Sequence, residues 1–433
     1  MPGGGGGVVP RPRAQGRGRR RRQKQTPSLP LDVVLAIAAR TDAATLVRCA
    51  ATCAEARRRL VDDDPSNLRR RLRLRHTDRF VLPLLRGDLA HVNDDSYRRK
   101  SDTYLVDAAA ADGCKVRRVT TGGRPLSSRD GLLLLRMDKE LRVCDPATGR
   151  SHAVPLPPPE TLPDSVKFNG KYVLLVGDGE DGGGGSSNST GRSFQILLAC
   201  LEVSPHRRYL QLVTFSPERG GAWSPCGEIR IPNLQGSKMK RGLGRGRAVV
   251  IGGAVHWLCL TDAGHYSVKL HVKTAQVAVA ALPESVPISP YRWRHERLLA
   301  ASSAGSGGSP VLLVADGNRV LCWAQAKQTA KWKPQPRVVV DTETMLRFLD
   351  GAGGTRPSTS MWSTTHQLEL EWFAERSGAV LIRMADYHFF WLDLQSMEII
   401  RWYSDTRISY GSKHCPYEMS LSDWVPTFNS TAV

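Results

Sequence analysis

Hydrophobic residues follow two different periods along this 433-residue chain, and the change between them divides it. From residue 29 to about residue 60, apolar positions recur every three or four residues, as on one face of an α-helix. Pro30 and Asp32 favour a helix start, because proline fits the first turn and an acidic side chain stabilises a helix N-terminus. Asp42 is a suitable cap for a second helix. The pattern predicts three short helices, whose apolar stripes are Val33, Val34 and Ile37 and then Leu46, Cys49, Ala50 and Cys53.

The rest of the chain is dominated by short runs of Val, Leu and Ile between Gly and Pro, which predict β-strands joined by turns. A similar phrase of apolar runs returns several times. Units of roughly 40 to 50 residues, each with about four short strands, match the blades of a β-propeller, because one blade cannot bury both of its faces alone. We expect about six blades, with a β-sandwich of the same strands as the alternative. The copies span residues 131–157, 248–283 and 368–397, with weaker ones at 194–232 and 298–323.

The helical segment carries the residues of a known motif: Leu-Pro-x-Asp-Val from Leu29, then Leu46-Val47-Arg48, and an Arg-rich turn before Leu60. This segment resembles an F-box, through which substrate receptors dock on the Skp-type adaptor of cullin-based SCF ubiquitin ligases. Many F-boxes carry Trp where this chain has Ala56. An ordinary helical hairpin packed on the main domain is the alternative. The resemblance implies that the adaptor-binding and core positions are Leu29, Pro30, Val33, Ile37, Leu46, Val47, Cys53 and Leu60.

The strand phrases at residues 130–135, 143–150 and 252–258 are similar to those of plant F-box proteins with an associated C-terminal β domain. The expected fold is therefore a multi-domain α+β protein, with a small three-helix module before a mostly β domain. The expected division is a disordered basic leader (1–27), the F-box-like module (28–62), a helical connector (63–95), the β-propeller (96–425) and a tail (426–433).

The net charge of +20 is concentrated partly in the leader, which contains eight Arg and Lys residues between positions 11 and 24 and no acidic residue. Such a segment cannot pack a core, and it suits a nuclear localisation signal, a nucleic-acid contact or a solvated tail. No apolar run reaches the ~20 residues of a membrane span, and no secretory signal is evident. Nine cysteines without a Cys-x-x-Cys pair favour reduced thiols. We expect a soluble protein of the nucleus or cytoplasm.

The sequence offers no catalytic constellation, so we expect no catalytic residue, metal or cofactor. His256 and Cys259 are three apart in a predicted strand, where they point to opposite faces and cannot easily share a metal ion. His414 and Cys415 are adjacent and cannot readily meet as base and nucleophile. All ten tryptophans lie from Trp223 onward, and most are expected in the core, although Trp293 or Trp332 could lie on a binding rim.

The sequence thus predicts a non-catalytic substrate-recognition subunit of an SCF-type ligase. Its expected partners are a Skp-type adaptor and, through it, a cullin, together with an unidentified protein substrate held on the β domain. The first alternative is a nuclear protein that binds nucleic acid through its basic leader. The second is a propeller enzyme or carbohydrate binder, for which the sequence offers no supporting residues.

Overall fold

A computed structural model of the chain describes residues 30–38, 55, 58–59, 85–93, 101–107, 114–119, 123–146, 150–177, 193–241, 248–287, 297–302, 308–326, 331–354, 368–384, 387–408 and 412–418. The chain divides into two compact units, Met1–Pro65 with Thr427–Val433, and Ser66–Pro426. In the first unit, helix α1 spans Leu31–Ala38. Among the described helices, none has the length and apolar character needed to cross a membrane.

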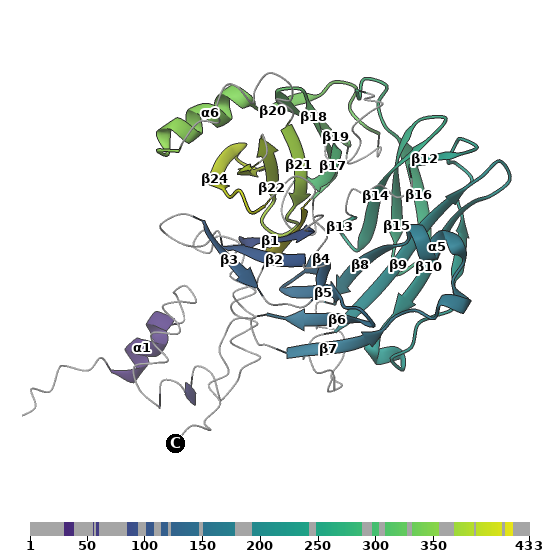
Figure 1. The fold of residues 1–433 in the computed structure, drawn as a ribbon, viewed down its shortest axis with the longest axis horizontal. Coiled ribbons are helices and arrows are strands. Elements are labelled where there is room, and N and C mark those ends of the chain that lie inside the picture. Colours follow the sequence, from purple (N-terminus) through teal and green to yellow (C-terminus); the bar gives the residue numbers. More distant parts are fainter. Residues whose placement is uncertain are drawn as a thin grey trace, which may run out of the picture. The chain divides into compact units, whose positions relative to one another are not determined.

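The second unit is a six-bladed β-propeller, built from six antiparallel sheets (Figure 1). Blade 1 contains β25 (Lys413–Glu418), β1 (Leu85–Asn93), β2 (Ser101–Asp107) and β3 (Lys115–Val119). Blade 2 contains β4 (Arg124–Arg129), β5 (Leu132–Arg136), β6 (Glu140–Asp145) and β7 (Arg150–Pro155). Blade 3 contains β8 (Lys171–Val176), β9 (Phe194–Val203), β10 (Arg208–Phe215) and β11 (Gly227–Arg230).

Blade 4 has five strands, because β12 (Met239–Arg241) and β13 (Val249–Ile251) both pair with β14 (Ala254–Thr261), which is followed by β15 (His265–His271) and β16 (Gln276–Ala281). Blade 5 contains β17 (Arg297–Ala301), β18 (Pro310–Asp316), β19 (Arg319–Ala324) and β20 (Arg337–Asp341). Blade 6 contains β21 (Leu368–Phe373), β22 (Ala379–Met384), β23 (His388–Asp393) and β24 (Glu398–Ser404). The predicted propeller of about six blades is confirmed, and the alternative of a sandwich is wrong.

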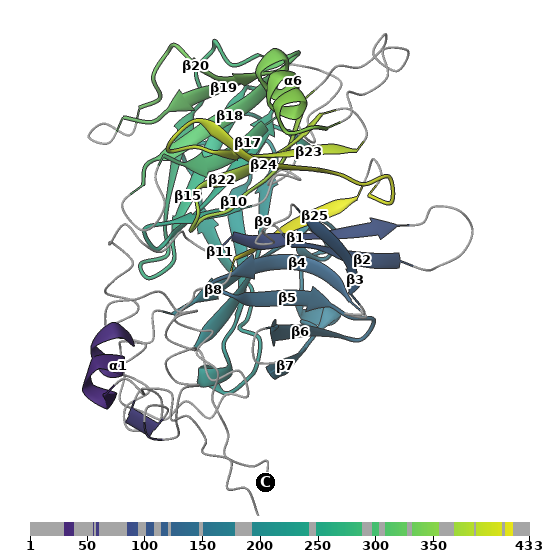
Figure 2. The ribbon, with the colours of Figure 1, turned by 90° about the vertical axis from the view of Figure 1, so that its left-hand side faces the viewer.

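One edge strand of each sheet lies innermost, next to its counterparts in neighbouring blades. Thus β25 contacts β4, β4 contacts β8, β13 contacts β17, β17 contacts β21, and β21 contacts β25. The five predicted repeat copies fall in blades 2 to 6. The repeat pattern did not predict blade 1, because this blade combines a strand from the start of the propeller with one from its end, and β25 pairs with β1 (Figure 2).

The predicted helical connector over residues 63–95 is wrong for Leu85–Asn93, which forms β1 of the propeller. The physical reason lies in two buried polar residues, Asp88 and His91, which break the apolar run that normally reveals a two-sided strand. Each is satisfied by a partner on another strand, as His91 is by Thr103 of β2, whose hydroxyl lies 3.1 Å from its Nδ1. The propeller therefore starts before the predicted boundary at residue 96.

The hairpin between β4 and β5 shows how the local sequence sets the turns. Arg129 pairs with Leu132, which leaves Asp130 and Gly131 as a two-residue turn with φ of 52° and 81°. Positive φ at both positions is the backbone that matches the twist of a hairpin, and Asp-Gly adopts it at low cost. This turn places Asp130 at the end of the inner strand, where it is buried.

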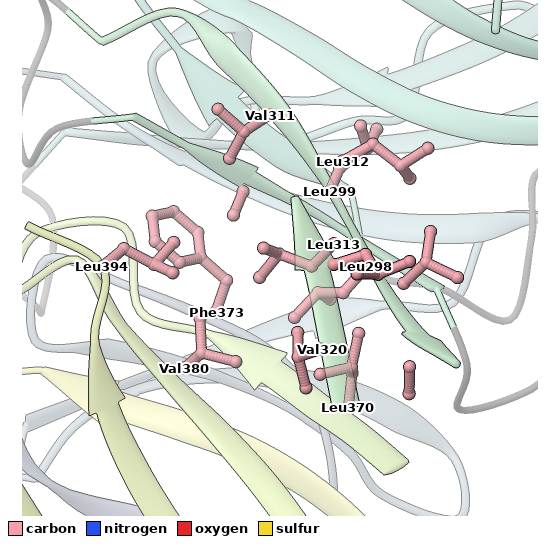
Figure 3. Packing of buried hydrophobic residues seen from close by; sticks show 14 of the residues in the cluster. Leu298, Leu299, Val311, Leu312, Leu313, Val320, Leu370, Phe373, Val380 and Leu394 are labelled. Atoms are coloured by element: carbon pink, nitrogen blue, oxygen red, sulfur yellow. The ribbon is translucent and has the colours of Figure 1, made fainter. Parts of the chain in front are cut away.

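The core lies between the blades. The largest buried cluster joins blades 4, 5 and 6, and between blades 5 and 6 it brings Leu298 and Leu313 against Leu370 and Phe373 (Figure 3). Each such side chain contributes about 1.5–3 kcal/mol through removal of apolar surface from water. Four tryptophans are fully buried, namely Trp257, Trp323, Trp372 and Trp391, so the expectation that most tryptophans serve packing is confirmed for those described.

The described helices of the propeller are short. α5 spans Asp164–Asn169, and the 3-10 turns η3 and η4 span Pro159–Thr161 and Pro217–Arg219. α6 (Thr342–Gly351) follows β20, and the Asp341 carboxylate caps it by accepting the backbone N–H of Thr344 at 2.7 Å. Met345 and Leu349 of α6 are buried.

Candidate functional site

Helix α1 begins where the sequence predicted it to begin. Pro30 directly precedes the helix, and its carbonyl accepts the backbone N–H of Val34 at 3.1 Å. Asp32 lies in the first turn. Val34 is buried, whereas Val33 has 37% of its surface exposed. The side chain of Val34 is therefore covered by the protein, whereas the side chain of Val33 is accessible from solvent.

The structure describes only a few of the other residues predicted to dock on the adaptor. Ile37 belongs to α1, but its side chain is outside the description. Glu55 pairs with Arg58 and Arg59 at 2.9 Å, and the hydrogen bond from Arg58, followed by that from Arg59, lowers the pKa of Glu55. Two arginines of the Arg-rich turn before Leu60 thus have a carboxylate partner three or four residues away in the sequence. Leu29, Leu46, Val47, Cys53 and Leu60 lie outside the described residues, as do Ala56 and the basic leader.

In the propeller, charged residues gather where the inner strands end. We call Arg129, Asp130, Glu375, Arg376 and Glu418 the carboxylate end. Arg129 pairs with Glu375, and Arg376 pairs with Asp130. The Glu375 carboxylate also accepts the backbone N–H of Val250 at 2.6 Å. Blades 2, 4 and 6 are joined by these contacts.

Glu418, at the end of β25, brings blade 1 into the same network. Its two carboxylate oxygens accept the backbone N–H groups of Arg376 and Ser377, at 2.9 and 2.7 Å. The hydrogen-bonded partners in this cluster are 41 to 246 positions apart along the chain, so no local pattern could have revealed them. Sequence analysis missed the whole cluster for this reason.

The electrostatics of the carboxylate end favour the neutral forms of its glutamates. Burial raises the pKa of Glu375 to about 7, although the Arg129 guanidinium opposes that shift, and the nearby Glu418 and Asp130 carboxylates add to it. Burial likewise raises the pKa of Glu418, against the hydrogen bonds from Arg376 and Ser377. Glu375 can therefore exchange a proton near neutral pH, but both of its oxygens are occupied by protein donors. The arrangement is suited to bracing blades rather than to catalysis.

A second buried cluster lies beside the ring closure. Asp88 of β1 is fully buried, and its carboxylate accepts the indole N–H of Trp372 at 2.7 Å. Nδ1 of His414 lies 2.6 Å from the same carboxylate, and the Tyr403 hydroxyl lies 3.4 Å away. Phe389 stacks on Tyr403 with 4.7 Å between the ring centres. These contacts bind β1 and β25 of blade 1 to blade 6.

The pairs that sequence analysis weighed as candidate chemistry are separated by the strands. In β14, Cys259 packs with Trp257, while the alternate residue Leu258 packs in a different cluster, so His256 and Cys259 face opposite sides as predicted. Burial, with a smaller effect of Lys269, lowers the pKa of His256 to about 4, and burial raises the pKa of Cys259 to about 12. Both are neutral at physiological pH.

The structure also shows where other residues considered as metal ligands, catalytic groups or binding residues lie. Within the described ranges, no three His, Cys, Asp or Glu side chains are grouped to hold a metal ion. His414 is engaged with Asp88, while the adjacent Cys415 packs among Leu89 and Leu133. Trp332 is partly buried against the core of blades 5 and 6. Trp293 lies outside the described residues.

Comparisons with solved structures return other proteins at low identity. TolB from Acinetobacter baumannii is 10% identical, with a TM-score of 0.40 over 77% of this chain and 67% of TolB. A chain of the nidogen/laminin complex is 7% identical, with a TM-score of 0.37 over 76% of this chain and 98% of that one. No curated protein matches the chain.

One family model matches residues 120–429, which is more than half of the chain. The match begins just before β4 and extends past β25, so it takes in blades 2 to 6 and the closing strand of blade 1. Its description is a domain of unknown function. The chain therefore belongs to the DUF7595 family.

Proposed function

We propose that this protein is a substrate-recognition subunit of an SCF-type ubiquitin ligase, in the nucleus or cytoplasm. In this proposal the F-box-like segment docks on a Skp-type adaptor, and the propeller holds the protein substrate. The observation that carries the proposal is helix α1, which starts directly after Pro30 in the F-box-like phrase and leaves Val33 exposed. An exposed apolar side chain on an eight-residue helix gains free energy when a partner covers it.

The propeller suits a binding role because its rigid blades hold surface groups in fixed positions. Its closure by β25 and β1 and its buried Asp88 cluster leave the ring without an open blade edge at that junction. A receptor needs no reactive group of its own. Holding substrate lysines near a charged ubiquitin-conjugating enzyme makes the transfer effectively intramolecular.

The test is co-purification of the full chain with a Skp-type adaptor. Val33→Asp places a charge on the exposed face of α1, and we expect it to reduce adaptor recovery by about tenfold or more. Phe168→Asp is the matched control, because Phe168 is an apolar residue of α5 in the propeller with 82% of its surface exposed. A second comparison uses the triple variant Leu29→Ala, Pro30→Ala, Ile37→Ala, which should also lose the adaptor.

Two results would contradict the proposal. The first is failure of the wild-type chain to bind the adaptor, and the second is equal loss in the Val33 and Phe168 variants. Deletion of residues 1–25 should leave adaptor binding intact. If the same deletion instead removes a salt-sensitive interaction with nucleic acid, the alternative function through the basic leader is supported.

A further inference from the structure

The inner strands β4 and β8 begin beside each other at the opposite end from the carboxylate end. The backbone N–H of Leu174 in β8 donates to the Ser127 hydroxyl of β4 at 3.3 Å. This hydrogen bond places Leu174 of β8 beside Ser127 of β4. Arg124 and Lys171 each lie three residues before those positions, at the first residue of each strand. Each strand therefore begins with a basic residue at the same level of the ring.

A third cation comes from the partner strand of β4. Arg136, the last residue of β5, is directly opposite Arg124 in the antiparallel register. Residues in such pairs project from the same face with Cβ atoms about 4.5–5.5 Å apart. Tyr172, the second residue of β8, lies close enough to Arg136 for the guanidinium charge to oppose the rise that burial causes in the pKa of Tyr172. We call Arg124, Arg136, Lys171 and Tyr172 the cationic end.

Backbone packing fixes both strand starts. Gly123 precedes Arg124, and a Cβ added there would lie 2.4 Å from the sulfur of Met137. Gly170 precedes Lys171, and a Cβ added there would lie 2.5 Å from the carbonyl oxygen of Val166 in α5. The chain is thus held close to its neighbours directly before each basic residue.

Within the described part of the chain, no carboxylate is paired with these cations. Among the described residues, Arg124, Arg136 and Lys171 form no ion pair, and Asp138, two residues after Arg136, is not paired with them either. Partial burial of the guanidinium, followed by the positive charge of Arg136, lowers the pKa of Arg124. Burial, followed by the charge of Arg124, lowers the pKa of Lys171. The cations therefore repel one another, and like charges directly opposite in a sheet are destabilising.

The ordinary alternative is that these side chains are only solvated, since Arg124 and Arg136 are exposed. Solvation does not explain why three cations and a phenol lie at one end of the neighbouring strands β4, β5 and β8. The partly buried arginines at the other end, Arg129 and Arg376, are each matched with a carboxylate. At the cationic end no described carboxylate lies beside the arginines in this way, so an anion from solution can take that place.

We propose that Arg124, Arg136, Lys171 and Tyr172 bind a phosphate group. Two guanidinium forks and one ammonium supply enough N–H donors for a tetrahedral dianion, and arginine matches phosphate oxygens in pairs. Burial raises the pKa of Tyr172, so its hydroxyl stays protonated and can donate as well. This site is distinct from adaptor docking through α1, and it does not depend on the proposed ligase function.

The phosphate group can belong to a small molecule or to a phosphorylated protein segment. Calorimetric titration of the full chain with inorganic phosphate, with O-phosphoserine and with phosphoserine peptides distinguishes these sources. Equal affinities would assign the site to small phosphorylated molecules, and tighter binding of the peptides than of their unphosphorylated forms would assign it to protein-borne phosphate. Each outcome supports the phosphate site.

The decisive variant is Arg124→Gln with Arg136→Gln, compared with Arg219→Gln and Arg230→Gln. Both pairs remove two positive charges from exposed arginines of the propeller. At constant ionic strength we expect the first pair to weaken phosphate binding about 100-fold, since each charge-assisted pair contributes roughly tenfold. The control pair should leave it unchanged. Arg124→Lys, which keeps the charge but removes the fork, should give an intermediate loss.

Phosphate should also raise the melting temperature of the wild-type chain and of the control pair, but not that of the Arg124 and Arg136 variant. This readout shows at the same time that each variant is folded. Absence of phosphate binding by the wild-type chain would overturn the proposal. So would equal weakening in both pairs, because binding would then follow net charge alone.

Discussion

The two ends of the inner strands differ in whether their basic side chains have carboxylate partners. At the carboxylate end, Arg129 and Arg376 each meet a carboxylate from another blade. At the cationic end, five residues earlier on β4, Arg124 faces Arg136 across the hairpin and Lys171 across the blade boundary. The same strand thus carries one arginine whose charge contributes to the fold and one whose charge opposes it. Such a difference separates groups that hold a structure from groups that are available to a ligand.

The largest effect should come from the most deeply compensated charge. Asp88→Ala leaves the Trp372 indole N–H and the His414 ring without their acceptor in a fully buried site. Loss of one partner of a buried charged network costs about 3–5 kcal/mol, and we expect a decrease of that size in the free energy of unfolding. Denaturant unfolding of the variant beside wild type measures it. A decrease of less than about 1 kcal/mol in the free energy of unfolding would show that Asp88 contributes little to the closure of the ring by β1 and β25.

The direct comparison uses two arginines of the same strand. Arg129→Gln leaves Glu375 without its guanidinium partner, so we expect a loss of about 2–3 kcal/mol in the free energy of unfolding. Arg124→Gln removes the same charge from the other end of β4 and should change the free energy of unfolding by less than about 0.5 kcal/mol. Equal losses in the two variants would remove the distinction between the ends.

The ends should also differ in their response to pH. The folded pKa of Glu375, about 7, is above that of an ordinary glutamate, so between about pH 4.5 and 7 the folded state binds more protons than the unfolded state. Stability therefore declines as pH rises through this range and levels off above it. Unfolding measured from pH 5 to 8 should show a shallower decline in Glu375→Gln. Arg124→Gln should keep the wild-type slope, and an identical slope in all three proteins would contradict the assignment to Glu375.

The smallest effect concerns the repulsion at the cationic end. In the absence of phosphate, Arg124→Gln with Arg136→Gln should raise the free energy of unfolding by a few tenths of a kcal/mol, because it removes like charges that face each other. The gain should shrink as salt is raised from about 0.05 M to 0.5 M, since both side chains are exposed to screening. A destabilised double variant at low salt would indicate a stabilising role for these arginines in the folded chain.

Much of the fold was predictable because a propeller repeats its local pattern. Apolar runs marked blades 2 to 6, and Asp130-Gly131 marked a hairpin turn. Blade 1 was not predictable from the same pattern, since β1 buries Asp88 and pairs with a strand near the other end of the sequence.

The carboxylate end depends on contacts between blades, which no local spacing records. The cationic end did leave a signal, because Gly123-Arg124 and Gly170-Lys171 are equivalent dipeptides directly before apolar strands. The helix start at Pro30 was also predictable, because capping and proline chemistry act within a few residues. Whether α1 docks on an adaptor stays a prediction.

The pairing of β25 with β1 has a consequence for synthesis of the protein. On the ribosome, β1 emerges about 320 residues before β25, which at about 5–20 residues per second means a delay of roughly 16–64 s. During most of that interval β1 has a free edge and its Asp88 has neither Trp372 nor His414, and His414 arrives only with β25 itself. An exposed strand edge readily pairs with other chains. The nascent protein should therefore be a client of chaperones that shield such edges until the last strand arrives.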